Sequence, residues 1–500
     1  MKKVLNLLVV LLVFLAFSCS SSKSQNDTDV MPDEDIDTQD SEIQDDDSET
    51  QEAEIADDSD EILDADSDSP EPTEEIFEET EPVNGYARCY DKIPAGPYEG
   101  FFADPNLESQ IKQILGHDED YELKEEDLEK ITEITLSVKD IRGVEKLVNL
   151  EYAKFSDRGG GGNIYDFTPL SNLKKLKKIA IYFRRPVEID PNEHVKNMTC
   201  LDGSFSLLTT IETLEIKETK LKDVSPIEQL VNLKTLELSD NQIASLPANL
   251  GNLQKLEWLA FDDNKIKNIE TLKLLINLKE LFFHDNYVED VSPLKDLVNL
   301  TRLGCNNNNI RDMSPITNLV NLTYYLGLNQ NRIEKIPKEM ANLKKLQELD
   351  LTFNNISDLP NFKGLNSLVT LRLSNNALSN EDLMKLDDLE SVRFLDVALN
   401  KITKVPVMKN LKSLQELYLN YNSITDLSGF ADNESFPALR RLDVGSNKID
   451  NVEAFRNRTG LSSLWVDKNC IKDFSPLEEL QERGTYVGGM NEQLESCEDK

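Results

Sequence analysis

The chain has 500 residues, with 93 acidic against 54 basic side chains and a formal net charge of −39. This excess disfavours nucleic acid and anionic membrane surfaces as partners, because both are themselves negatively charged. The charge is concentrated between Asp27 and Glu81, where 27 acidic residues and no Lys or Arg occur.

The first eighteen residues have the pattern of a signal peptide. Basic residues 2–3 precede an apolar run over residues 4–17, which is shorter than the roughly 20 residues needed to span a bilayer. The next residues, Ala16-Phe17-Ser18-Cys19, resemble the lipobox of bacterial lipoproteins, which implies cleavage before Cys19 and a lipid on its thiol. The alternative is ordinary secretory cleavage at the same bond. We therefore expect an exported protein that is either anchored to a bacterial outer membrane or cell surface, or secreted.

Residues 19–84 consist mostly of Asp, Glu, Ser, Thr and Pro. A segment of this composition cannot bury enough apolar surface to offset the entropy of ordering, so we expect a disordered acidic linker. The alternative is a calcium loop, because Asp64, Asp66, Asp68 and Glu75 match several ligand positions of an EF-hand. Ser69 stands where that loop needs Gly, however, and no helical pattern flanks the run, which favours a solvated linker.

Residues 85–130 are predicted to form an N-terminal cap that contains a helix. Asp104-Pro105 is a favourable helix start, and Leu107, Ile111, Ile114 and Leu115 fall on one helical face. A stack of repeats needs such caps to cover its end cores.

Leucine-rich repeats extend over residues 131–475. The segment 233–243 follows the pattern LxxLxLxxNxI, and this frame recurs every 22 to 25 residues at Leu256, Leu278, Leu300, Thr323, Leu346, Leu368, Val392, Leu414, Leu439 and Leu461. Looser copies begin near Ile131, Leu150, Leu176 and Ile211, which makes about fifteen turns. The LxL core of each repeat has the period of a short strand with its Leu side chains pointing inward.

The repeats predict an α/β solenoid, a leucine-rich-repeat horseshoe with a parallel β-sheet on its concave face. The ninth position holds an unbroken series of asparagines: Asn241, Asn264, Asn286, Asn308, Asn331, Asn354, Asn376, Asn400, Asn422, Asn447 and Asn469. We expect their amides to satisfy backbone groups that would otherwise be buried without a partner, and so to be scaffold and not a site. Motifs such as Ser292-Pro293-Leu294 suit a tight turn or 3₁₀ segment on the convex side.

These repeats resemble the short leucine-rich repeats of the bacterial internalin family, and they are similar to those of the eukaryotic phosphatase-one regulatory leucine-rich subunit. The segment 102–107, Phe-Ala-Asp-Pro-Asn-Leu, also looks like the helical N-terminal cap of the bacterial proteins. The internalin resemblance implies a recognition protein. The phosphatase comparison would require a cytosolic protein, which the signal peptide disfavours.

Export makes disulfides possible. Cys470 follows the last Asn of the series and Cys497 lies 27 residues further on, so we expect this pair to close a C-terminal cap at residues 476–500. Cys305 occupies an inward strand position and is predicted to be an inert core thiol. Cys89 and Cys200 form a weaker candidate pair.

Aromatic and charged side chains fall on outward template positions and predict a binding surface for a protein, or alternatively a glycan. The predicted binding residues are Trp258, Phe282, His284, Tyr325, Phe353, Arg372, Phe394, Tyr418, Tyr421, Arg440 and Trp465. Acidic residues gather in the N-terminal half of the repeats. Arg372, Arg393, Arg440 and Arg441 gather in the C-terminal half, so we expect a surface with oppositely charged halves.

Two irregular stretches interrupt the repeats, at residues 157–163 and 183–206. The second contains Arg184, Arg185 and His194. An alternative hypothesis is that the chain is an enzyme whose site lies in this second stretch. No acid–base, nucleophile or metal-ligand constellation occurs at a working spacing. We therefore expect a non-enzymatic recognition protein without cofactor or metal. A passive structural spacer is the second alternative.

Overall fold

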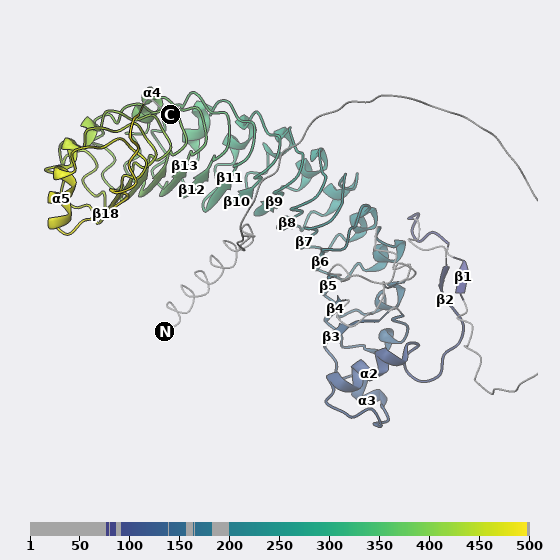
Figure 1. Ribbon diagram of the computed structural model, residues 1–500. Helices are drawn as coiled ribbons and strands as arrows, with labels where there is room; N and C mark the ends of the chain where they lie inside the picture. The colour runs from purple at the N-terminus through teal and green to yellow at the C-terminus, as the bar shows by residue number, and fades with distance from the viewer. Residues whose placement is uncertain are drawn as a thin grey trace, which may run out of the picture. The chain divides into compact units, whose positions relative to one another are not determined.

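The computed structural model describes residues 77–79, 81–86, 92–138, 140–156, 164, 166–182 and 200–497. Within them the repeats build one parallel sheet of 16 strands, in which each strand pairs with the strands of the neighbouring repeats. The strands follow one another along the inner side of the curve that the repeats make, and short 3₁₀ helices lie on the opposite side (Figure 1). The fold is therefore the leucine-rich-repeat solenoid that the sequence predicts.

The sheet consists of β3 (Glu133–Leu136), β4 (Tyr152–Ser156), β5 (Lys178–Tyr182), β6 (Thr213–Lys217), β7 (Thr235–Glu237), β8 (Trp258–Ala260), β9 (Glu280–Phe282), β10 (Arg302–Gly304), β11 (Tyr325–Gly327), β12 (Glu348–Asp350), β13 (Thr370–Arg372), β14 (Phe394–Asp396), β15 (Glu416–Tyr418), β16 (Arg441–Asp443), β17 (Ser463–Trp465) and β18 (Tyr486–Gly488). The last strand lies within the segment that the sequence predicts to be a C-terminal cap.

The connections contain short helices. The 3₁₀ helices are η1 (Val144–Lys146), η2 (Thr168–Leu170), η3 (Gly203–Leu207), η4 (Ser225–Gln229), η5 (Leu250–Asn252), η6 (Glu270–Leu274), η7 (Ser292–Leu294), η8 (Ser314–Asn318), η9 (Lys338–Asn342), η10 (Ser428–Phe430) and η11 (Glu453–Phe455). The α-helices are α2 (Pro105–Ile114), α3 (Glu125–Leu128), α4 (Asn380–Lys385) and α5 (Ser475–Glu482).

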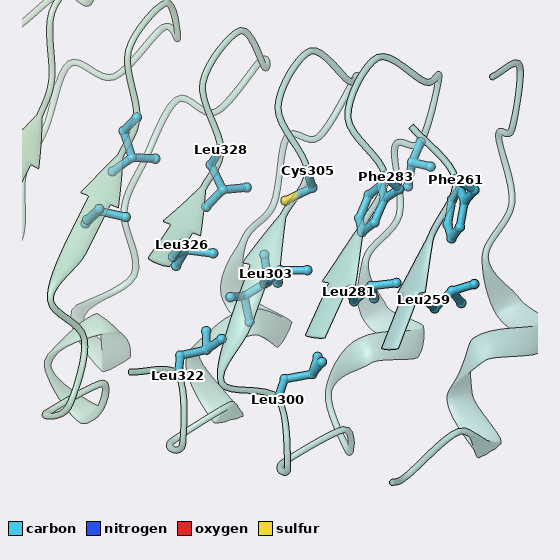
Figure 2. Close-up of a cluster of buried hydrophobic side chains, with 14 of the residues drawn as sticks. Leu259, Phe261, Leu281, Phe283, Leu300, Leu303, Cys305, Leu322, Leu326 and Leu328 are labelled. Atoms are coloured by element: carbon cyan, nitrogen blue, oxygen red, sulfur yellow. The ribbon is translucent and has the colours of Figure 1, made fainter. Parts of the chain in front are cut away.

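The core is a set of parallel rows of apolar side chains, one side chain from each repeat. The central strand residues Leu281, Leu303 and Leu326 pair across neighbouring strands and are fully buried (Figure 2). Cys305 occupies the row that Phe283 and Leu328 continue, and its thiol is free and buried. Burial raises the pKa of Cys305, because the thiolate would lose its solvation there. Cys305 is therefore the inert core thiol that the sequence predicts.

The asparagine series joins each repeat to the one before it. The Nδ2 group of Asn308 donates to the carbonyls of Phe283 at 2.9 Å, Cys305 at 3.3 Å and Asn306 at 3.0 Å. Its Oδ1 atom accepts from the backbone N–H of Val288 at 2.9 Å. The other members of the series repeat this pattern, so one side chain satisfies buried backbone groups of two successive turns.

Gln493 takes the place of the asparagine at the C-terminal end of this series. Its Nε2 group donates to the carbonyls of Val466 at 2.9 Å and Gly489 at 2.7 Å, and its Oε1 accepts from the N–H of Ile471 at 3.3 Å. The expected disulfide between Cys470 and Cys497 is present, with a Cα–Cα distance of 5.7 Å. The last residues are thus tied to the final repeat by both a covalent bond and hydrogen bonds.

A short antiparallel hairpin of β1 (Phe77–Glu79) and β2 (Lys92–Pro94) precedes the repeats, so a described strand lies within the stretch that the sequence predicts to be disordered. Tyr86, between these strands, donates from its hydroxyl to Glu228 Oε1 at 2.6 Å. A side chain at Gly203 would collide with the Tyr86 carbonyl, so glycine allows this close approach. Residues 83–86, which precede helix α2, therefore contact the 3₁₀ helices η3 and η4. These helices lie more than one hundred residues further along the chain.

Helix α2 begins at Pro105 as expected, and the Asp104 side chain accepts from the N–H of Asn106 at the helix start. Leu107 and Ile111 are buried in the same apolar cluster as Ile134 of β3, whereas Ile114 is 43% exposed. The apolar face of this helix is therefore shorter than the sequence pattern suggests.

Several predicted features lie outside the described residues. These are the signal peptide with Cys19, the acidic linker up to residue 76, the glycine-rich stretch 157–163, and residues 183–199 of the second interruption with Arg184, Arg185 and His194. Cys200 is disulfide-bonded, and its expected partner Cys89 also lies outside the described residues.

We expect Asn308→Ala to lower the free energy of unfolding by about 1–3 kcal/mol, because the buried N–H of Val288 loses its partner and two buried carbonyls each lose one of their two side-chain donors. The control is Asn277→Ala, whose exposed amide makes one hydrogen bond, to the Gln254 carbonyl, and which should cost less than about 1 kcal/mol. Urea unfolding followed by circular dichroism measures both. Equal losses in the two variants would contradict a special role for the buried series.

Removal of the disulfide by Cys470→Ser should loosen the C-terminal end by about 3–4 kcal/mol, the chain entropy of a loop of 27 residues. Hydrogen exchange at the Leu494 amide, which donates to the Asn469 carbonyl, measures this loss. Cys305→Ala serves as the control, because it changes a buried row far from this end and should leave Leu494 protected. Recovery of Cys470 and Cys497 as free thiols from unreduced protein would refute the bond.

Candidate functional site

The outward side of the sheet is formed by the residues that flank the buried central residue of each strand. In-register pairing places the first residues of successive strands side by side, so that Trp258 adjoins Glu280 and Arg302 adjoins Tyr325. The third residues form a second row, in which Ala260 is followed by Phe282. We use the term strand face for one surface of the sheet. It consists of the outward-pointing residues of β7–β18 together with the two outward-pointing residues that follow each of these strands.

None of the predicted binding residues is buried. Half-buried side chains are those of Trp258, Phe282, His284, Tyr325, Arg372, Phe394, Tyr418 and Trp465, and exposed ones are those of Phe353, Tyr421 and Arg440. Arg440 precedes β16 by one residue. It therefore lies beside the strand face, at the edge of the sheet where the strands begin. The remaining ten are on the strand face.

A first group of rings extends across β8 to β11. The rings of Trp258 and Phe282 lie 6.1 Å apart, as do those of Phe282 and His284. A side chain at Gly304 would collide with the His284 ring, and one at Gly327 would collide with the Tyr325 ring. The two glycines thus leave the space that these rings occupy.

His284 is held in its neutral form within this group. Its Nδ1 accepts from the backbone N–H of Asn306 at 3.1 Å, and burial lowers the pKa of His284 to about 4. The carboxylate of Asp262 accepts from the backbone N–H of His284 at 2.6 Å, yet burial raises the pKa of Asp262 to about 7. The Asn306 amide also donates to the Tyr325 hydroxyl at 3.0 Å, which links the ring group into one network.

A second group lies on β13 to β15. The Arg372 guanidinium stands 5.2 Å from the centre of the Phe394 ring, and that ring lies 5.2 Å from the Tyr418 ring. A third contact, between Trp465 and Tyr486, joins β17 and β18 at 6.1 Å. The predicted aromatic residues therefore form separate clusters along the sheet and not one continuous strip.

The expected division into an acidic and a basic half is wrong for the strand face. Arg372 forms an ion pair with Glu348, and Arg441 pairs with Glu416 at 3.4 Å, so neither arginine contributes unpaired positive charge. The same half carries acidic residues at the third strand position, among them Asp350 and Asp396. The sequence argument failed because it counted the arginines without the glutamates that precede them by one repeat.

The residue just before each asparagine of the buried series has a left-handed backbone, with φ between 48° and 60°. These residues are Asp240, Asp263, Asp285, Asn307, Gln330, Phe353, Asn375, Leu399, Tyr421, Ser446 and Lys468. Asp and Asn tolerate this conformation because their short polar side chains bond locally, whereas larger side chains incur a cost.

Three large side chains, those of Phe353, Leu399 and Tyr421, occupy these unfavourable positions at φ values of 52° to 55°. They remain 49%, 43% and 51% exposed. None of them makes an aromatic contact or a side-chain hydrogen bond within the described residues. Leu399 was missed by sequence reasoning, and the signal that could have identified it is a large apolar residue directly before a series asparagine.

Among the described residues, no group of His, Cys, Asp and Glu has an arrangement that could hold a metal ion. Over the same residues no helix has the length and apolarity required to cross a bilayer.

Comparisons with known proteins agree with this geometry. Residues 300–486 match the model of a leucine-rich repeat region, and residues 232–253 match that of a single leucine-rich repeat. An internalin (inlF) from Listeria monocytogenes is 26% identical, with a TM-score of 0.55 over 73% of this chain and 95% of the internalin. A leucine-rich-repeat protein of Leptospira interrogans is 22% identical, with a TM-score of 0.58 over 73% of this chain and 97% of its own. At this identity the similarity supports a shared fold and nothing further.

A sequence relative, the acidic leucine-rich nuclear phosphoprotein 32 family member A of Drosophila melanogaster, is 40% identical over 83 residues, or 17% of this chain. The chain spans about a third of the length of such relatives. The repeats, the sheet and these matches together establish that the chain is a leucine-rich-repeat protein, with a fold similar to that of an internalin.

Proposed function

We propose that the chain is a recognition protein that binds a protein partner through the strand face, with no catalytic step. The observation that carries this proposal is the placement of Phe353, Leu399 and Tyr421. Each puts an exposed apolar side chain at a left-handed position that favours Asn or Asp, and within the described residues that side chain makes no ring contact or hydrogen bond. Aromatic side chains such as those of Phe353 and Tyr421 are enriched at the centres of protein interfaces, where most of the binding energy arises.

The rest of the strand face supports this proposal. A rigid sheet holds Phe394, Tyr418 and Trp465 in fixed positions, so little side-chain entropy is lost on binding. The clusters stand next to Asp396 and Asp443, whose pKa values are raised because burial disfavours the charged form. An interface that mixes apolar rings with polar groups is typical of protein recognition, whereas a passive spacer would not need such side chains.

The proposal extends to the aromatic group around His284. Gly304 and Gly327 leave the sheet without side chains at two successive third positions, and the rings of Phe282, His284 and Tyr325 cover that space. This part of the strand face presents a group of aromatic rings, tilted relative to one another, beside Asp262. A glycan, which stacks well on flat rings, is the alternative partner for this group.

The triple variant Phe353→Asn/Leu399→Asn/Tyr421→Asn separates binding from stability. Asn already occupies the same position at Asn307 and Asn375, so each change should relieve up to about 1 kcal/mol of backbone cost. We expect the thermal midpoint to stay level or rise, while capture of the protein partner from surface extracts falls at least tenfold. Calorimetry and quantitative pull-down measure the two effects.

The matched control is Val231→Asn/Ile276→Asn/Val298→Asn, which removes three exposed apolar side chains away from the strand face. This control should retain partner capture. Equal loss of capture in both triple variants, or full capture by the first, would rule out the proposed role of the three residues.

We also propose that the chain is exported and held at a bacterial surface by a lipid on Cys19. Support comes from the sequence of residues 2–19, with its basic start, short apolar run and Cys after a small residue. The acidic residues between Asp27 and Glu81 then separate the repeats from the anchor. In this arrangement the strand face would be available to partners outside the cell.

Cys19→Ala should shift the protein from the membrane fraction to the soluble fraction, because one thioether-linked lipid group provides the anchor. Fractionation followed by immunoblotting measures the distribution. Cys305→Ala is the control, since its buried thiol has no access to lipid, and it should stay with the membrane. Membrane association of the Cys19→Ala protein would end the lipid hypothesis.

A further inference from the structure

A second series of asparagines runs along the edge where the 3₁₀ helices lead into the strands. Their Nδ2 groups donate to the backbone carbonyl 23 residues earlier, at 2.8–2.9 Å. The members are Asn232, Asn277, Asn299 and Asn321. This edge series is solvent-exposed or half-buried, whereas most of the series at the ninth template position is buried.

A shallow hollow of about 660 Å³ lies over this edge, between the repeats of β7 and β12. Its lining comprises four lysines, three asparagines, a glutamine, a threonine and a single glutamate. Every side chain in the lining is thus polar. The methylene stems of the lysines form part of the surface, but no aromatic or large aliphatic residue lines the hollow, so it lacks the anchoring side chains around which protein interfaces are built.

The hollow is positively charged although the chain as a whole carries a charge of −39. The only carboxylate in its lining, that of Glu257, is paired with Lys279 at 2.8 Å, and Lys234 pairs with Glu212 at 2.6 Å. The other two ammonium groups, of Lys255 and Lys345, have only amide partners.

Lys255 donates to Asn232 Oδ1 and Lys345 to Asn321 Oδ1, each at 2.7 Å. Neither has a carboxylate partner within the described residues. The amides therefore hold two unneutralised positive charges in place at opposite ends of the hollow. An anionic group of a ligand can replace the amide at each lysine and gain a charge-assisted hydrogen bond.

We propose that this edge hollow binds a linear acidic polysaccharide, whose carboxylates contact Lys255 and Lys345 and whose hydroxyls contact the amides between them. The repeats follow one another at the strand spacing of about 4.8 Å, so the donors form a regularly spaced row that a linear polymer can follow. No aromatic side chain lines the hollow, which disfavours a nucleic acid, because single strands are bound largely by base stacking. This site is separate from the strand face and does not depend on the proposed protein recognition.

Binding of polygalacturonate, a polymer of uronic acid, to the full chain tests the proposal. We expect Lys255→Gln/Lys345→Gln to weaken binding about tenfold, because two ion contacts are lost. We expect binding to weaken further as the salt concentration is raised by roughly one decade, from about 20 to about 200 mM, because surface charges become screened over this range. Biolayer interferometry with immobilised protein measures both effects.

The matched control is Lys295→Gln/Lys335→Gln, which makes the same charge change at exposed lysines outside the hollow and should leave affinity within about twofold. The triple Asn variant of the strand face should also bind polygalacturonate normally, which keeps the two proposals distinguishable. Equal binding of poly-glutamate or oligo-dT, an equal loss in the lysine control, or no binding of polygalacturonate would overturn the proposal.

Discussion

The fold depends on one interaction, the set of hydrogen bonds by which a buried asparagine joins two successive turns. A solenoid with strands of three to five residues cannot satisfy its backbone within the sheet alone, because most of each repeat lies outside the strands. Asn308 makes four hydrogen bonds to the backbone of two turns, and its equivalents do so in the neighbouring repeats. At the end of the stack Gln493 performs the same task with a longer side chain.

The same interaction creates the candidate site. To bring the asparagine amide into the interior, the chain reverses at the preceding residue, which takes a left-handed conformation in every one of these repeats. The side chain of that residue is directed outward at the end of the strand. Most repeats fill the position with a small or polar residue, and Phe353, Leu399 and Tyr421 are departures from this rule. A scaffold constraint therefore fixes where exposed side chains can be displayed, and sequence variation at that position decides what is displayed.

The sequence predicts the repeats well because each structural role recurs at a fixed spacing. The parallel sheet, the buried asparagines and the Cys470–Cys497 bond all follow from positions within or just after the template. The contacts between repeats are harder to predict. The repeat template describes positions within one repeat and does not say which side chains of neighbouring strands meet. It therefore cannot predict the ion pair of Arg372 with Glu348 or the space above Gly304. The contact of Tyr86 with Glu228 joins segments 142 residues apart and has no local pattern at all.

The two asparagine series show how burial decides the role of one residue type. In the buried series both the N–H and the carbonyl groups of the amide bond to the backbone, and a substitution leaves at least one buried backbone N–H without its partner. In the edge series the backbone uses one N–H of Asn277 or Asn321, and the carbonyl oxygen is left for solvent, a lysine or a ligand. The edge amides can therefore exchange partners at little energetic cost, which is the property a ligand site requires. The same spacing that makes the solenoid thus produces both a rigid scaffold and a regular row of exchangeable polar groups beside it.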